Sequence, residues 1–176
     1  KEFNKVTKKY DAVRRCLNDS FGCNKIAVEK IKHFISKDAL NIDGLGKKVV
    51  EKFWELNLIR KPQDIFSLKY DYIANLDGWG KLSVDNLRNS INKSKIVSLQ
   101  RFIYSIGIRH IGTENAKIIS ENLKNTEHFL EIIRTKKFEK FLNIDGIGET
   151  QINSLKNFFS NKFNSDIVIQ LNSILK

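Results

Sequence analysis

The sequence predicts an all-α fold in which a helix, a tight glycine turn and a second helix are repeated four times. Short glycine signatures recur at residues 42–46, 76–80, 108–112 and 144–148. Their last glycines lie 34, 32 and 36 residues apart, and a near-constant period of this length is typical of repeated supersecondary units. Helical apolar patterns flank each signature, so the signatures mark turns between helices.

The segments that follow the four turns are predicted to be helices with one apolar face. Apolar residues follow the last glycine of each turn at offsets of four and seven, which is the spacing of one helix face. These residues are Val50, Phe53, Val84, Leu87, Ala116, Ile119, Ile152 and Leu155. The residue between two turn glycines is also expected in the core, namely Leu45, Trp79 or Ile147. For Trp79 a surface wedge is the alternative.

The segments before the turns show helical spacing as well. Their apolar residues are Ile31, Phe34, Ile35, Ile65, Phe66, Ile73, Leu99, Phe102, Ile103, Ile106, Ile132, Ile133, Phe141 and Leu142. Pro62 falls in the expected first turn of the second of these helices, where its missing N–H is tolerated. The absence of the Trp, Tyr and Pro signature argues against a tetratricopeptide repeat. Residues 26–176 therefore form one helical domain.

Residues 1–25 form a separate segment in this interpretation. Residues 6–15 contain β-forming side chains and precede Cys16 as a strand precedes a metal knuckle. Cys16 and Cys23 are the only cysteines in the chain. Two cysteines do not make a disulfide framework, so the pair indicates half of a metal site that needs two more ligands.

The composition favours a soluble intracellular protein with a polyanionic partner. The 176 residues include 31 Lys and Arg against 20 Asp and Glu, which gives a net charge of +11 and a positive field over much of the surface. No apolar run approaches the length of a membrane span, and the N-terminus does not resemble a signal peptide. The absence of Met favours an excised domain of a longer protein over a processed chain.

Each glycine turn opens a helix N-terminus, where backbone N–H groups lack helical partners and the dipole favours an anion. Without a Cβ, a phosphate can approach these groups, so we expect nucleic-acid binding that is independent of base sequence. The predicted DNA-binding residues are the turn glycines and adjacent basic residues: Gly44, Gly46, Lys47, Lys48, Gly78, Gly80, Lys81, Arg109, His110, Gly112, Gly146 and Gly148. The fourth turn, followed by Glu149, is the least basic.

The remaining polar candidates favour structural roles. Asp43, Asp77 and Asp145 recur in the turns, which favours local caps over a catalytic metal cluster. His33 and His128 share no metal-ligand spacing and are interpreted as surface or helix-packing residues. No catalytic motif is present, so the sequence predicts a binding module.

Two strings of the sequence carry a family resemblance, Ile31–Gly46 and Arg101–Gly112. Both closely resemble the C-terminal half of bacterial NAD-dependent DNA ligases, and the resemblance extends from about Tyr10 to the end of the chain. In that family a four-cysteine zinc finger precedes four helix-hairpin-helix motifs, which grip the minor groove on both sides of a nick. The resemblance implies the same organisation here, with the four glycine turns as the hairpins.

The resemblance also implies where the cofactors of ligation belong. Cys16 and Cys23 would be the second cysteine pair of the zinc finger, and the first pair would precede Lys1. A Cys₄ zinc site needs all four thiolates, so zinc binding would be incomplete in this chain. NAD and Mg²⁺ would serve an adenylation domain that lies, with its catalytic lysine, outside these residues. The chain alone is therefore expected to bind DNA without sealing it.

The expected partners are nicked double-stranded DNA and the other domains of the same ligase, acting as a monomer in replication and repair in the bacterial cytoplasm, at the nucleoid. Two alternatives stay open. One is a helix-hairpin-helix module of another repair or recombination protein. The other is a helical protein-interaction scaffold, for which behaviour toward DNA would not depend on salt.

Overall fold

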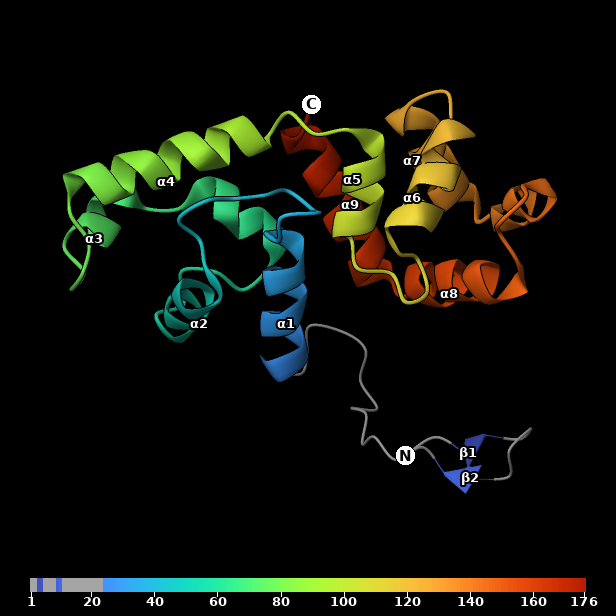
Figure 1. Cartoon of the computed structure of the whole chain (residues 1–176), viewed down its shortest axis with the longest axis horizontal. Coiled ribbons are helices and arrows are strands. Elements are labelled where there is room, and N and C mark those ends of the chain that lie inside the picture. Colours follow the sequence, from blue (N-terminus) through green and yellow to red (C-terminus); the bar gives the residue numbers. More distant parts are fainter. Residues whose placement is uncertain (1–2, 5–8, 11–23) are drawn as a thin grey trace.

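The computed structural model describes residues 3–4, 9–10 and 24–176 (Figure 1). Within residues 24–176 every regular element is a helix, which confirms the all-α class. The α-helices are α1 (Asn24–Phe34), α2 (Lys47–Glu55), α3 (Tyr70–Ala74), α4 (Lys81–Ser94), α5 (Leu99–Ser105), α6 (Thr113–Glu121), α7 (Thr126–Thr135), α8 (Glu149–Ser160) and α9 (Lys162–Ile174). Two 3₁₀-helices join them, η1 (Pro62–Ser67) and η2 (Phe138–Asn143).

The N-terminal segment is described at two short strands. Strands β1 (Phe3–Asn4) and β2 (Lys9–Tyr10) pair antiparallel, with Phe3 opposite Tyr10. Strand β2 lies within the strand expected over residues 6–15, but the rest of that expected strand lies outside the described residues. Cys16 and Cys23 also lie outside them, so the metal site and the boundary at residue 25 stay predictions.

The helices that follow the glycine turns are confirmed. Helices α2, α4, α6 and α8 each begin one residue after the last glycine of a turn. All eight residues predicted at offsets of four and seven are buried, at 5% exposure or less. Leu45, Ile147 and Ile111 of the turns are buried too, while Trp79 is half-buried and packs on the core. The apolar pattern therefore located one helix of each repeat correctly.

The elements before the turns are less uniform than the sequence predicts. In the second repeat the expected helix is divided into η1 and α3, with Pro62 as the first residue of η1. The Asp64 carboxylate accepts the N–H groups of Arg60 and Lys61 at 2.8 Å and fixes the start of η1. In the fourth repeat the turn is preceded by η2 rather than by an α-helix.

The geometry of η2 explains why one residue of the apolar pattern before the fourth turn is not buried. Leu142 belongs to that pattern, but its side chain is 43% exposed. A 3₁₀-helix has three residues per turn, so Phe138 and Phe141 lie on its buried side and the next residue points outward.

The four repeats associate as two pairs (Figure 1). In the first pair, Leu87 of α4 lies against the first turn, 3.7 Å from the position of a Cβ on Gly44. The Asp43 N–H of the same turn donates to Ser90 Oγ of α4 at 2.7 Å. Conversely, Trp79 of the second turn packs on Phe53 of α2, with ring centroids 5.6 Å apart. Each turn thus docks on the second helix of its partner repeat.

The second pair repeats this arrangement. His110 Nδ1 of the third turn is 3.1 Å from Ser154 Oγ of α8. Ile118 of α6 lies against Gly146 of the fourth turn, 2.8 Å from the position of a Cβ there. Both pairs are therefore built on the same reciprocal contact between a turn and the partner's helix.

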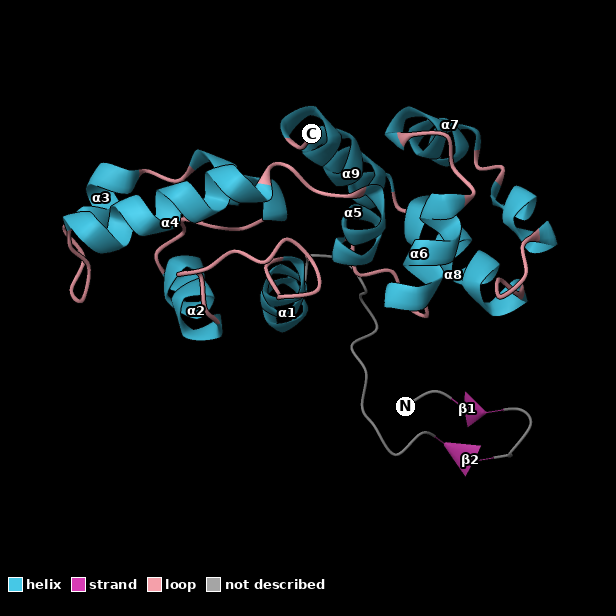
Figure 2. Cartoon of the chain, turned by 45° about the horizontal axis from the view of Figure 1, so that its top comes forward, coloured by secondary structure: helices cyan, strands magenta, loops and turns pink. Residues whose placement is uncertain are grey.

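Polar contacts and α9 join the two pairs. The Arg101 guanidinium of α5 donates from Nε to the Ala39 carbonyl at 2.7 Å and from Nη2 to the Lys37 carbonyl at 2.5 Å. His33 of α1 lies on α5, with Nε2 2.8 Å from the Tyr104 carbonyl. This confirms His33 as a helix-packing residue. Helix α9 lies between the pairs in both views (Figure 1; Figure 2) and packs on η1, α7 and α8.

Phe53 is the central test of the first pair, because its side chain is fully buried and contacts the ring of Trp79. We expect Phe53→Ala to lower the free energy of unfolding by about 3–5 kcal/mol. Urea denaturation followed by tryptophan fluorescence measures this change. Tyr72→Ala is the control, because Tyr72 is 47% exposed; equal losses in the two variants would contradict the pairing of the turns.

Candidate nucleic-acid interface

The first glycine of a turn reverses the chain. Gly44, Gly78 and Gly146 have φ between +79° and +87°, a left-handed conformation that glycine adopts without a Cβ penalty. In the third turn the same position is held by His110, with φ of +61°. The His110 carbonyl accepts Asn115 Nδ2 at 2.8 Å, which helps to hold this less favourable residue. These positions are therefore explained by the fold itself.

The last glycine of each turn is not explained by the fold. Gly46, Gly80, Gly112 and Gly148 are helix N-caps with extended backbones that any residue adopts. A Cβ would meet no atom within 4 Å at Gly46, Gly80 or Gly112, and only Gln151 Oε1 at 3.6 Å at Gly148. Ser, Asp or Asn would cap these helices better than Gly. The missing Cβ instead leaves the helix N-termini open to a partner outside the chain.

Backbone N–H groups are available at these N-termini. Within residues 24–176, no group accepts the N–H of Gly46 or of Gly112. The N–H of Gly80 donates to Ser83 Oγ at 2.9 Å, and that of Gly148 donates to Gln151 Oε1 at 3.1 Å. The first and third turns therefore offer the most donors, together with the N–H groups of the following helical turn.

The predicted basic residues surround these donors. Lys47, Lys48, Lys81, Arg109 and His110 are all exposed. The first turns of α2 and α4 contain no acidic residue, whereas α6 carries Glu114 and α8 carries Glu149. The first pair is thus the more basic one, and the fourth turn is the least basic, as the sequence indicates.

Two other lysines form ion pairs between the elements on either side of a turn. Lys32 of α1 forms ion pairs at 2.7 Å with Glu29 and with Glu51 of α2, and these hydrogen bonds raise the pKa of Lys32. Lys156 of α8 lies 2.6 Å from Glu139 of η2, and this hydrogen bond lowers the pKa of Glu139. These pairs hold together the two helices of the first and the fourth repeat.

The turns gather along one edge of the molecule. The loops that lead into α4, α6 and α8 emerge at the lower edge in both views, and α2 lies on the same side (Figure 1; Figure 2). The loops on the opposite edge lead into α5 and α7. The helix N-termini that follow the turns therefore form a single candidate interface, with its most basic part at the first pair.

A polar groove extends this interface beyond the residues that the sequence predicts. It measures about 610 Å³ and lies between the third turn and α8, lined by Arg109, His110, Thr150, Asn153 and Asn157 among others. The α8 residues were missed, although polar residues three to four positions apart opposite a buried face were a readable signal.

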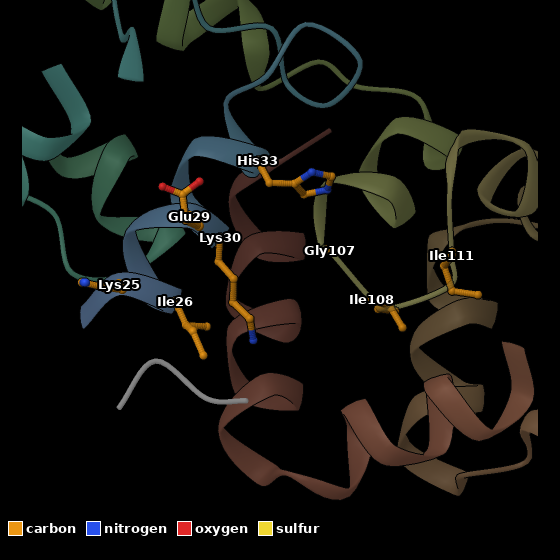
Figure 3. Close-up of a pocket in the computed structure, with 8 residues that line it drawn as sticks. All are labelled: Lys25, Ile26, Glu29, Lys30, His33, Gly107, Ile108 and Ile111. Carbon is orange, nitrogen blue, oxygen red and sulfur yellow. The ribbon is translucent and has the colours of Figure 1, made fainter. Parts of the chain in front are cut away.

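A neighbouring hollow of about 450 Å³ lies between the third turn and α1. Figure 3 shows Lys30 reaching into it from α1, with Ile108 and Ile111 on the opposite wall. The groove and the hollow share Ile26, Lys30 and Gly107. Polar and cationic side chains thus continue from the third turn to both neighbouring helices.

The aspartates of the turns do not act as caps. Asp43, Asp77 and Asp145 are exposed, and none of their carboxylates accepts a hydrogen bond from residues 24–176. The cap interpretation was wrong because the N-cap positions are the glycines. Across the same residues no cluster of three metal-binding side chains occurs, and no helix is long and apolar enough to cross a membrane.

Part of this architecture matches a known motif family, and most of the chain matches known proteins. A helix-hairpin-helix motif family matches residues 101–168, which contain the third and fourth turns. The DNA ligase of Pelagibacter ubique is 58% identical over 171 residues, covering 97% of this chain and 25% of that protein. The DNA ligase of Rickettsia bellii is 41% identical over 177 residues, covering 94% of this chain and 26% of that protein.

The chain is homologous to one segment of bacterial DNA ligases. It spans about a quarter of the length of the curated relatives that it matches. The DNA ligase resemblance of the two sequence strings is therefore confirmed, and the helix-hairpin-helix motif is confirmed for the third and fourth turns. The first and second turns share their backbone geometry and their reciprocal packing.

The two glycines of a turn are expected to respond differently to substitution. Gly146→Val should lower the free energy of unfolding by about 2 kcal/mol or more, because φ is +87° and a Cβ would meet Ile118 Cδ1 at 2.8 Å. Gly112→Ser should leave it unchanged or raise it by a few tenths of a kcal/mol. Urea denaturation measures both, and a destabilised Gly112→Ser protein would show that the fold does need this glycine.

Proposed function

We propose that this chain is the part of a bacterial DNA ligase that holds duplex DNA by its phosphate backbone. The observation that carries the proposal is the set of N-cap glycines, where the fold leaves space that it does not use. Backbone N–H groups and the helix dipole favour an anion there. Phosphate contacts position a protein on DNA without reading the base sequence, and a ligase must act at any sequence.

The paired turns suit a duplex rather than a single strand. Within each pair, each turn packs on the second helix of the other repeat. The two helix N-termini of a pair therefore face the DNA together. In the proposed complex the two turns of a pair contact the two strands across the minor groove. The two pairs lie on either side of the nick. Lys47, Lys48, Lys81 and Arg109 supply charge next to the phosphates, and release of counterions drives binding.

The chemistry of strand joining belongs to the whole ligase in this proposal. Adenylation with NAD⁺, and the Mg²⁺ that serves it, require residues other than the interface described above. Cys16 and Cys23 are the only cysteines of this chain, so a Cys₄ zinc site needs two thiolates from elsewhere. The contribution of these residues to ligation is to hold the nicked duplex.

The dependence of DNA affinity on salt tests the electrostatic part of the proposal. We expect fluorescence anisotropy to give a steep negative slope of log affinity against log salt concentration, with little preference for base sequence. Lys81→Ala should reduce that slope by about 0.9, the value for one lost phosphate contact. Lys124→Ala is the control, because Lys124 is exposed and precedes α7 on the opposite edge. Affinity that does not change with salt would favour a protein-interaction scaffold.

Substitution of an N-cap glycine tests the backbone part of the proposal. Gly46→Ser and Gly112→Ser should weaken DNA binding about tenfold each, because the added side chain occupies the approach of a phosphate while the helix stays capped. Ser98→Gly is the reverse control. Ser98 caps α5 through Arg101 N–H at 3.4 Å on the opposite edge, so its loss should lower stability and leave DNA affinity unchanged. Full affinity in both folded glycine variants would refute backbone contact at these turns.

A further inference from the structure

Leu82 is an exposed apolar side chain at the second turn, which lies at the α3 and α4 end of the proposed DNA interface (Figure 1). It is the second residue of α4, two positions after the N-cap Gly80, and its side chain is 75% exposed. Among large hydrophobic residues of the described part, only Ile96 is more exposed, at 78%. Exposure of a whole leucine side chain forgoes the gain from burial that the same residue has elsewhere in the fold.

The repeats provide an internal comparison for this position. The residues two positions after the other N-cap glycines are Lys48, Glu114 and Thr150, all polar and all exposed. The repeat of helix, glycine turn and helix therefore does not require an apolar residue at this position. The residues on either side of Leu82 in the chain, Lys81 and Ser83, are exposed as well. Leu82 is thus an exposed apolar side chain between Lys81 and Ser83, in a turn that also carries the exposed Asp77.

We propose that Leu82 packs against the sugar and base edges of the DNA groove beside the phosphate that Gly80 admits. This inference rests on the function proposed above. Next to each phosphate of a duplex lies the apolar face of a deoxyribose, and proteins that bind the minor groove insert leucine and similar side chains between base steps. A single leucine among lysine, serine and glycine matches that alternation of anionic and apolar surface.

A protein partner fits the surroundings of Leu82 less well. The core of a protein interface is a continuous apolar patch with few charges, whereas here Lys81 adjoins the leucine and Gly78 and Gly80 expose open backbone. The contact that we propose is apolar, so its contribution to affinity does not release counterions. Leu82 and Lys81 should therefore affect binding in ways that a salt series separates.

The test compares Leu82→Ala, Leu82→Met and Ile96→Ala by fluorescence anisotropy with a nicked duplex of mixed sequence over a range of salt. Leu82→Ala should weaken binding about tenfold, which is about 1.4 kcal/mol, with an unchanged salt slope. Leu82→Met should stay within about twofold of the native affinity, because it keeps the apolar volume. Ile96 is the matched control, since its loop is held by Val97 N–H to the Lys176 carbonyl, on the opposite edge.

The outcomes separate this inference from the proposed function. If the unmodified chain does not bind DNA, both fail. If it binds with a steep salt slope and Leu82→Ala binds equally well, only the Leu82 contact is refuted. A reduced salt slope in Leu82→Ala would also refute it, because the effect would then be electrostatic. Sedimentation velocity without DNA adds one more arm: a dimer that Leu82→Ala dissociates would assign the side chain to a second copy of the chain and overturn the proposal.

Discussion

The reciprocal docking of each turn on the second helix of its partner repeat is the contact on which the rest of the structure depends. A single repeat of about 34 residues, made of two helices and a glycine turn, cannot bury the apolar faces of both helices. Leu87 beneath the first turn and Phe53 beneath Trp79 close one pair, and Ile118 beneath the fourth turn closes the other. Because the turns are buried on one side by this contact, their other side is held rigidly outward, at the edge where the helix N-termini are exposed.

This arrangement divides the work between the two glycines of a turn. The first glycine, as at Gly146, has a left-handed backbone and lies against the partner helix, so it serves the fold. The second, as at Gly112, has an ordinary extended backbone and faces open space, and in the proposed function this space admits a phosphate. In the sequence, both glycines belong to one short signature, and nothing in that signature distinguishes their roles. Only the contacts around each position show that a substitution at one tests stability and at the other tests recognition.

The sequence was most informative where a residue's surroundings are set by its own helix. Val50 and its counterparts are buried because a helix period of 3.6 fixes which residues share a face, and a single pattern is enough to find them. Leu142 belongs to the apolar pattern but is exposed, because a 3₁₀-helix changes that period. His110 in a left-handed conformation and the α8 side of the groove depend on contacts between repeats, such as the one from His110 to Ser154. No pattern along the chain specifies which repeats pair.

The helices that follow the turns differ in how well their N-termini are stabilised. An acidic residue in the first turn of a helix stabilises it through the dipole, yet the same charge repels a phosphate. Helices α2 and α4 have a glycine N-cap, no first-turn acid and adjacent lysines. Helix α8 keeps Glu149 and gains the Gln151 bond to its N-cap. In the third turn Arg109 stands where the other turns carry aspartate, which offsets Glu114 of α6. Exposed basic side chains are therefore concentrated at the first, second and third turns, and the fourth turn is the least basic of the four.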